Sequence, residues 1–255
     1  LRKLLIDQSV SGAIEYAEQQ ISALLQNKID FSLLIITKSI SGDANSYKNK
    51  QPHVVLAEKM RKRDPGSAPV VGDRVPYVIV SGEKGKPICD RAEDPLFALE
   101  NSIPIDTKYY LEQQLSKPLL RLFECIIPNP QSLLSGDHTR TVVKPIPSVN
   151  TGILRFAQMT NRCIGCKSPI SINHADQGLC EYCNSTKSNI YNEKKIEVDQ
   201  VKAEFLKLWG QCQTCQGSSD LDVICASRDC PIFYKRTKVK KDLQEVEIIL
   251  NRLEF

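Results

Sequence analysis

The sequence lacks an apolar run long enough to cross a membrane, because no stretch approaches the roughly 20 residues that a spanning helix needs. The N-terminus also lacks the pattern of a secretion signal. We therefore expect no membrane partner, and disulfide bonds are disfavoured because they persist mainly in oxidising compartments. The chain does not begin with methionine, which predicts a fragment or a processed piece of a longer polypeptide.

Recognisable catalytic motifs are also missing. The sequence contains no phosphate-binding GxxxxGK[ST] loop, no GxSxG and no HExxH. Its acidic residues are scattered, whereas two-metal phosphoryl transfer needs a close set of carboxylates. The net charge is only +4, so any surface that binds nucleic acid must be a local one. We predict no catalytic residue in this chain.

What the sequence does contain is an uneven set of cysteines. Only Cys89 and Cys125 lie in the first 160 residues, and both are interpreted as isolated thiols. The other eight form four pairs near the C-terminus. This distribution predicts a metal-free N-terminal part and a small C-terminal part that metal holds together, because a small region with few aromatic residues has a thin core.

The first cysteine block has the spacing CxxC-x13-CxxC and comprises Cys163, Cys166, Cys180 and Cys183. A two-residue gap lets a tight turn direct two thiolates at one ion, and two such turns supply a tetrahedron of soft ligands. The spacing therefore indicates zinc. His174 lies inside the intervening loop, but four cysteines already fill the tetrahedron, so we interpret it as a loop residue.

The second block has the spacing CxxC-x9-CxxxxC and comprises Cys212, Cys215, Cys225 and Cys230. Its wider last gap and the following Pro231 are less typical of zinc and also suit an iron–sulfur cluster. Thiolates accept both metals, so the spacing alone leaves zinc and iron–sulfur open. At either block the metal is expected to fold the domain, and a closed four-cysteine site leaves no open position for hydrolytic zinc chemistry.

Periodicity predicts a mixed α+β chain in which helices dominate. Four prolines and a Ser-Gly-Asp turn between residues 128 and 147 mark a linker or irregular crossing, so the domain boundary is placed there. Pro118 falls inside one of the expected helices and predicts a kink or break. The expected helices are 10–28, 54–63 with Pro52 at the first position, 94–100, 106–123, 153–159, 190–209 and 238–253, and the expected strands are 33–37 and 75–80.

Two basic clusters could bind phosphates with salt-sensitive, sequence-independent affinity. The alternative for each cluster is a solvated helix face. The first cluster is Lys59, Arg61, Lys62 and Arg63, and the second is Lys235, Arg236, Lys238, Lys240 and Lys241.

Several long segments, in order, resemble the family B DNA polymerases. Residues 60–69 and 72–79, Glu93-Asp94-Pro95, and residues 109–121 resemble the thumb of these enzymes. Residues 222–234, around Cys225 and Cys230, resemble the second of two cysteine blocks at the C-terminal end of the family's eukaryotic replicative members. The resemblance covers nearly the whole chain and divides it into a thumb (1–127), a linker (128–160) and a cysteine-rich domain (161–255).

The resemblance implies a fold and a function. A mostly helical thumb with a few short strands would hold primer–template DNA through Lys59, Arg61, Lys62 and Arg63. A small, metal-stapled helical domain with two four-cysteine sites would dock an accessory B subunit and help contact a sliding clamp. The family's first block is taken to hold zinc and the second a 4Fe–4S cluster, with a second zinc as the alternative. The implied location is the nucleus.

The resemblance also implies what this chain does not contain. The palm, with its magnesium-binding aspartates, and the exonuclease domain would lie upstream, so the chain would be part of a DNA-directed DNA polymerase, a nucleotidyltransferase, but inactive alone. Two other functions fit the cysteines. One is a free-standing zinc-ribbon factor that regulates nucleic-acid transactions, and the other is a redox-sensing iron–sulfur module. The thumb-like segments argue against the first.

Overall fold

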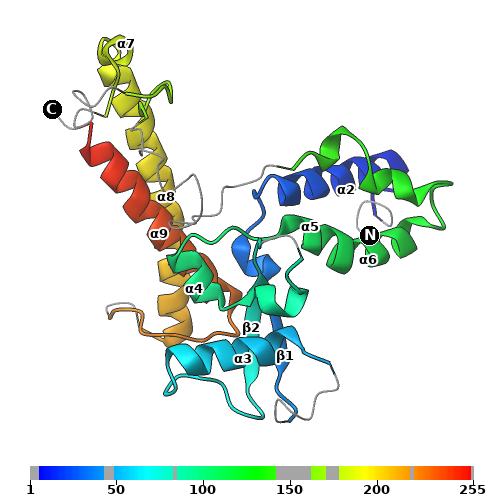
Figure 1. Cartoon of the computed structure of the whole chain (residues 1–255). Helices are drawn as coiled ribbons and strands as arrows, with labels where there is room; N and C mark the ends of the chain where they lie inside the picture. Colours follow the sequence, from blue (N-terminus) through cyan, green and yellow to red (C-terminus); the bar gives the residue numbers. More distant parts are fainter. Residues whose placement is uncertain are drawn as a thin grey trace. The chain divides into compact units, whose positions relative to one another are not determined.

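The computed structural model describes residues 6–42, 49–82, 85–141, 162–170, 178–218 and 221–253. The chain forms two compact units, Leu1–Pro147 and Ser148–Phe255, and each is described by itself (Figure 1). Helices dominate and one three-stranded sheet is present among the described residues, so the α+β class is confirmed. The division at residues 127 and 160 stays a prediction. None of the described helices has the length and apolarity that a membrane span requires.

The first unit is built around a small antiparallel sheet in the order β1-β2-β3. Its strands are β1 (Ile36–Ser39), β2 (Arg74–Ile79) and β3 (Ala92–Glu93). The paired residues are Ile36 with Tyr77, Thr37 with Pro76, Lys38 with Val75, Ser39 with Arg74, Val78 with Glu93, and Ile79 with Ala92. The predicted strand at 75–80 is confirmed. Pro76 pairs with Thr37 of β1, whereas β3 pairs only with Val78 and Ile79 of β2. Among the described strands, Pro76 therefore has a neighbour on one side only, which is where a strand tolerates the missing N–H of proline.

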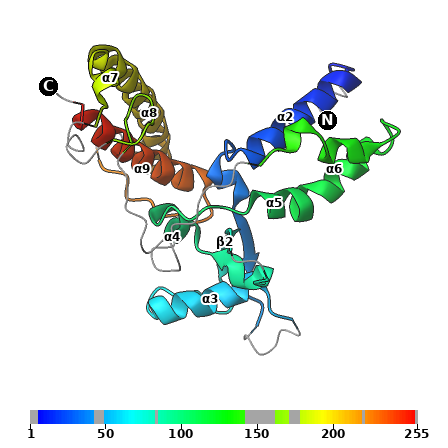
Figure 2. The same cartoon turned by 45° about the horizontal axis from the view of Figure 1, so that its top comes forward.

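Alternate side chains of β2 enter two different cores. Val75, Tyr77 and Ile79 pack in one buried cluster with residues of α2 (Val10–Leu25) and α3 (Pro52–Arg63). The helix α3 lies beside β2 (Figures 1 and 2). On the other face Val78 packs with a separate cluster, whose buried members are Phe31 and Ala98. Phe31 comes from the 3-10 turn η1 (Phe31–Leu34) and Ala98 from α4 (Pro95–Glu100). The central strand is buried on both faces, which makes this sheet the fixed frame of the unit.

Three helix starts follow the sequence signals. Pro52 occupies the first position of α3, where its missing N–H costs nothing. The Asp94 carboxylate accepts a hydrogen bond from the Phe97 N–H at 3.1 Å and caps α4. The Asp106 carboxylate accepts from the Tyr109 N–H at 3.1 Å and caps α5 (Thr107–Tyr109). These helix starts were predicted from local chemistry and are confirmed.

The expected break at Pro118 lies upstream of that residue. After α5 the chain makes a π-helical turn, η4 (Tyr110–Leu115), and then continues as α6 (Ser116–Phe123). Pro118 therefore stands in the first turn of α6, where no intrahelical acceptor is needed for its missing N–H. The change from π-helical to α-helical hydrogen bonding therefore falls before Pro118, and the proline does not interrupt a continuous helix.

The predicted strand at 33–37 is shifted. The Asp30 carboxylate accepts from the Ser32 N–H at 3.0 Å and starts η1, which takes up Leu33 and Leu34 and leaves β1 to begin at Ile36. The remaining short turns of this unit are η3 (Ile88–Arg91), η5 (Pro130–Leu134) and η6 (Asp137–Thr139).

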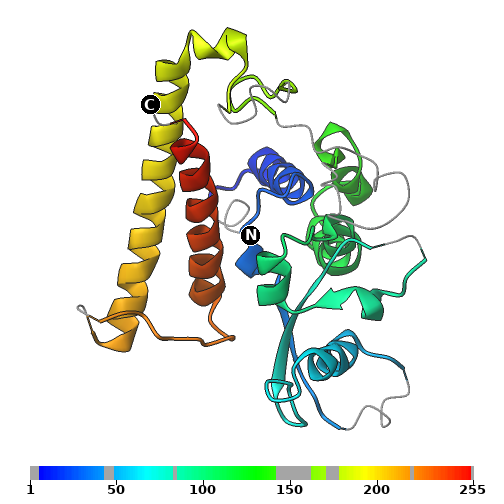
Figure 3. The same cartoon turned by 60° about the vertical axis from the view of Figure 1, so that its left-hand side comes forward.

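The second unit is dominated by two antiparallel helices, α8 (Lys187–Gln216) and α9 (Pro231–Asn251), which lie side by side (Figure 3). The short helix α7 (Glu181–Asn184) precedes them. Both long helices exceed the predictions of 190–209 and 238–253. The α8 helix ends only at Gly217, whose φ of 75° is the left-handed conformation of a glycine helix end. Pro231 is the first residue of α9, where its missing N–H needs no intrahelical acceptor.

The longer α8 changes the expected separation of the two cysteine blocks. From Lys187 to Cys212 a straight helix would span about 38 Å at 1.5 Å per residue, which is longer than the predicted helix 190–209 would allow. The predicted helix at 153–159 and His174 lie outside the described residues.

Candidate functional site

The first cysteine block forms a compact knuckle. A tight turn from Cys163 to Cys166 is closed by a 3.0 Å hydrogen bond from the Lys167 N–H to the Cys163 carbonyl, and Lys167 has a positive φ of 63°. Cys180 stands at the N-cap of α7 and Cys183 lies inside it. The four sulfur atoms all lie within 4.8 Å of one another. The sequence spacing therefore brings the four predicted residues together.

The knuckle is partly buried in a small core of its own. Cys163 is 0% exposed and Cys183 is 5% exposed, whereas Cys166 faces solvent. Gly165 has no side chain to obstruct this packing, since a Cβ there would lie 3.1 Å from the Cys183 sulfur and 2.8 Å from the Ile190 Cδ1. A larger residue at this position would push the turn away from the sulfur cluster. The surrounding apolar residues are Ile170, Leu179, Leu253 and Ile164.

Hydrogen bonds from polar neighbours surround the sulfur atoms. The Ser168 hydroxyl lies 2.8 Å from the Cys166 sulfur and lowers the pKa of that thiol to about 6. Burial acts to raise the pKa of Cys163, but backbone N–H groups, including that of Cys180 at 3.4 Å, outweigh it and lower this pKa. Burial raises the pKa of Cys183 to about 12. The cluster therefore contains thiols that ionise readily beside one that needs a compensating cation.

The donor set fits a four-coordinate thiophilic metal. Zinc–sulfur bonds of about 2.3 Å place tetrahedral sulfurs about 3.8 Å apart, close to the 3.6 Å between Cys166 and Cys180. The ten cysteines are free thiols in this structure. With four thiolates the site has no position for water, which makes it a structural centre rather than a hydrolytic one.

The second block gathers at one end of the α8–α9 hairpin. Cys212 and Cys215 lie in the last turns of α8, Cys225 lies in the connecting loop, and Cys230 caps α9. These four thiols are not within 4.8 Å of one another, and the first block is the one such cluster found among the described residues. The predicted helix ended at residue 209, but α8 continues through Cys212 and Cys215, so both residues are helical.

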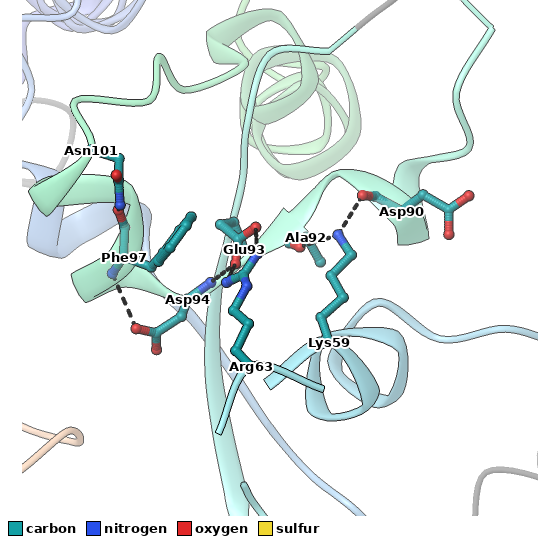
Figure 4. Close-up of polar contacts among 8 residues, drawn as sticks. All are labelled: Lys59, Arg63, Asp90, Ala92, Glu93, Asp94, Phe97 and Asn101. Atoms are coloured by element: carbon teal, nitrogen blue, oxygen red, sulfur yellow. Dashed lines mark hydrogen bonds and ion pairs between the residues drawn. The ribbon is translucent and has the colours of Figure 1, made fainter. Parts of the chain in front are cut away.

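The end of α3 carries the first basic cluster, and two of its four members make internal contacts (Figure 4). The Lys59 ammonium donates to the carbonyls of Asp90 at 2.6 Å and Ala92 at 3.0 Å. The Arg63 guanidinium donates to both carboxylate oxygens of Glu93, at 2.7 and 2.9 Å. It also lies 3.9 Å from the centre of the Phe97 ring.

The other two members of this cluster, Arg61 and Lys62, are exposed. Neither makes a hydrogen bond or ion pair with any residue that the structure describes. The four basic residues therefore divide into an inner pair that ties α3 to β3 and an outer pair whose charges face water. Contact with DNA stays a prediction for all four.

The second basic cluster is mostly engaged within the helical hairpin. Lys235 pairs with Glu204 of α8 at 3.2 Å, and Arg236 is buried. Lys238 and Lys241 pair with acids one turn further along α9, namely Asp242 and Glu245. For Lys235, Lys238 and Lys241, the alternative of a solvated, self-neutralised helix face fits these contacts better than a phosphate-binding surface.

Sequence reasoning missed two polar residues that shape these sites, Ser168 and Glu93. Ser168 is one of many serines, and only the folded turn shows that its hydroxyl meets Cys166. Glu93 lies 30 residues from Arg63 in sequence, so their pairing depends on the sheet. The family resemblance marks Glu93-Asp94-Pro95, but no local signal pairs Glu93 with Arg63 or Ser168 with Cys166.

Comparison with known proteins identifies the family. A family described as DNA polymerase family B matches residues 1–126, and one described as the C4-type zinc-finger of DNA polymerase delta matches residues 163–236. The DNA polymerase delta catalytic subunit of Bos taurus is 52% identical over 255 residues, which cover 99% of this chain and 23% of that protein. The chain belongs to the family B DNA polymerases. It is a fragment of the delta type, as the sequence resemblance implied.

Other family B relatives agree with this assignment. The DNA polymerase delta catalytic subunit of Schizosaccharomyces pombe is 52% identical across 100% of this chain, and that of Arabidopsis thaliana is 48% identical across 100%. The chain spans 23% of the length of each. The family B polymerase structure from Pyrobaculum calidifontis shares 28% identity over 48% of this chain and 15% of that chain, with a TM-score of 0.38, which is too low to support structural inference. Together with the four-cysteine knuckle, the zinc-finger match supports a metal in the C-terminal unit of this polymerase fragment.

Proposed function

We propose that this chain holds duplex DNA and docks an accessory subunit within a replicative DNA polymerase of the delta type. The observation that carries the proposal is the 52% identity to delta catalytic subunits along the whole chain. The parent protein would be a DNA-directed DNA polymerase of the nucleus. Its magnesium-dependent palm would lie in another part of the parent chain, so this fragment would bind and position without catalysing nucleotide transfer.

The first unit would act as the thumb, and its role is to hold the product duplex by the phosphates. Arg61 and Lys62 are the best candidates for direct contact, since both are exposed at the end of α3. Lys59 and Arg63 would support them by fixing that helix end against β3. Contacts to phosphates carry no sequence information, which suits an enzyme that must move across every sequence.

Replacing Arg61 and Lys62 together by alanine should weaken duplex binding equally for unrelated sequences. Each lost phosphate contact should lower the slope of log affinity against log salt concentration by about 1, so the double variant should lose about 2. Fluorescence anisotropy with a labelled duplex, repeated at several salt concentrations, measures both quantities. The matched control removes two exposed lysines of α8, Lys202 and Lys207, which changes the net charge equally. Unchanged affinity and slope in the Arg61/Lys62 variant would contradict the thumb proposal.

The second unit would hold two metals, zinc in the first block and a 4Fe–4S cluster in the second. The close-set thiols of the knuckle support zinc. The uneven CxxC-x9-CxxxxC spacing and the following Pro231 support the iron–sulfur cluster in the second block, since four thiolates can bind the four irons of such a cluster. When bound, either group supplies a rigid cross-link between segments, and the chain's own residues hold it, exclude water and present the docking surface.

The docking surface for the accessory B subunit would lie on the helical hairpin, with the sliding clamp contacted near the first block. The apolar residues of α8 and α9 divide into two groups. Leu208 and Leu250 are buried and serve as core, whereas Val201, Phe205, Trp209 and Ile249 are partly exposed. Ile196, Leu206 and Ile248 add side chains that are more than half exposed. So many exposed apolar side chains on two helices are typical of an interface.

Loss of the metal from the second block should also weaken binding of the accessory B subunit. In the wild-type chain, purified without oxygen, we expect one zinc and one four-iron cluster with a visible absorption band. Replacing Cys215 and Cys225 by serine should abolish the iron, keep the zinc, and weaken capture of purified B subunit. Both thiols are exposed, so the change costs little packing. Two zincs without colour would overturn the iron–sulfur assignment, and full capture by the iron-free variant would contradict the docking role.

Two other functions fit the cysteines, a zinc-ribbon regulator and a redox sensor. A free-standing zinc-ribbon regulator is disfavoured by the family B match over residues 1–126. A redox-sensing role for the second block would require that oxidising the cluster change DNA affinity, which the same anisotropy assay measures.

A further inference from the structure

One buried cation among the residues that the structure describes lies beside the second cysteine block. Arg236, in the second turn of α9, is only 8% exposed. One of its terminal nitrogens, Nη2, donates to the Cys225 carbonyl at 2.9 Å. The other, Nη1, is buried and has no hydrogen-bond acceptor among the described residues. No carboxylate of the described chain lies within ion-pair distance of the guanidinium.

A buried, uncompensated guanidinium is costly. Moving a charge out of water is tolerated in proteins when an opposite charge or several hydrogen bonds replace the lost hydration. Here one hydrogen bond to a carbonyl and two aromatic rings are present. The Arg236 Cζ lies 5.9 Å from the centre of the Trp209 ring and 5.8 Å from that of Phe233. Ring faces compensate a buried cation only in part, so the contacts present leave a positive charge without its counter-charge.

The surroundings of Arg236 point to the second block as that counter-charge. Trp209 precedes Cys212 by three residues on α8, which places both side chains on the same side of the helix. Cys225 is contacted directly through its carbonyl, and Cys230 caps the helix that carries Arg236. The guanidinium therefore contacts the Cys225 segment and lies near the segments of Cys212 and Cys230, which together carry three of the four thiols.

The chemistry of the donor set explains why a cation would be buried there. Four thiolates with one zinc ion, or with an oxidised four-iron cluster, carry a net charge of about −2. A positive group next to such a centre stabilises its thiolate ligands against protonation and metal loss. The same group would also favour uptake of an electron by a cluster, since reduction adds negative charge.

We propose that Arg236 is the charge-compensating and positioning residue of the second metal centre. Its Nη2 holds the Cys225 segment against α9, and its charge offsets that of the ligated thiolates. This inference rests on the proposed metal in the second block and holds for either metal. The exposed cations on the same helix do not share this role, because solvent screens their charges.

The test compares three variants of the full chain, loaded with metal under anaerobic conditions. Arg236→Gln keeps a side-chain amide donor for the Cys225 carbonyl but removes the charge. Arg236→Lys keeps the charge. Lys240→Gln removes an exposed charge from the same helix and serves as the matched control. The readout is the rate at which a chelator removes the second-block metal, with the first-block metal of the same molecule as the internal reference for folding.

We expect Arg236→Gln to lose the second metal about tenfold faster or more, the usual range for a residue that supports metal ligands. Arg236→Lys should stay close to the wild type, and Lys240→Gln should match it. If the second block holds iron, the reduction potential of Arg236→Gln should also become more negative, a shift that a purely structural role would not produce. Equal release rates for Arg236→Gln and the wild type would overturn the role of Arg236 alone. A wild-type chain without any second-block metal would overturn the proposed centre itself.

Discussion

Replacing Cys163 by serine is expected to release the first-block metal and unfold the knuckle formed by residues 162–170 and 178–183. Cys163 is fully buried, and its sulfur accepts the Cys180 N–H. A structural zinc site contributes about 10–16 kcal/mol of apparent binding energy in small zinc-binding peptides. A core as small as this one cannot replace that contribution. Metal analysis should show the loss of one zinc, and limited proteolysis should cut the knuckle while sparing α8 and α9.

The control for this experiment is Cys125→Ser. Cys125 is exposed and far from either block in sequence, so its replacement should change stability by no more than about 0.5 kcal/mol and leave the zinc in place. A Cys163→Ser protein that kept its zinc and its resistance to protease would show that the cluster is not a metal site.

Replacing Arg63 by alanine should destabilise the first unit by about 2–3 kcal/mol. The change leaves the Glu93 carboxylate, whose side chain is only 9% exposed, without the guanidinium that binds both its oxygens. Breaking a fully buried ion pair costs about 3–5 kcal/mol, and the estimate is reduced because the Arg63 side chain is 39% exposed. The contact with the Phe97 ring is lost as well. Chemical denaturation followed by circular dichroism measures the change.

Arg61→Ala is the matched control for Arg63→Ala. Arg61 is exposed two residues earlier on the same helix, so stability should change by no more than about 0.5 kcal/mol. Hydrogen exchange should accelerate in β3 and α4 for the Arg63 variant alone, because Glu93 lies in β3 and Asp94 caps α4. Equal effects of the two changes would mean that the pair with Glu93 contributes nothing measurable.

The contrast between Arg61 and Arg63 shows where sequence reasoning stops. The run Lys59 to Arg63 predicted one basic patch, and helical periodicity alone already separates its members onto different sides of α3. Which side faces β3 depends on Glu93 and on the carbonyls of Asp90 and Ala92, all about 30 residues away. Ala92 and Glu93 form the two-residue strand β3, which no local pattern predicts, and Asp90 lies in the preceding turn η3.

The two cysteine blocks separate the contributions of sequence and structure. Ligand type, pairing of the cysteines into two blocks and the family all follow from the sequence, because spacing and residue identity are local properties. The helix starts at Pro52, Asp94 and Asp106 follow from it for the same reason.

Only the tertiary structure decided which of these residues come into contact and which are buried. It brought the first four thiols together within 4.8 Å, carried α8 through Cys212 and Cys215, and started α9 at Pro231. It also buried Arg236 beside the second block and assigned Arg63 to Glu93. These outcomes depend on contacts between residues distant in sequence and on the burial that such contacts create. The free energy of a buried charge has no counterpart in a sequence pattern, since it arises only when packing removes water.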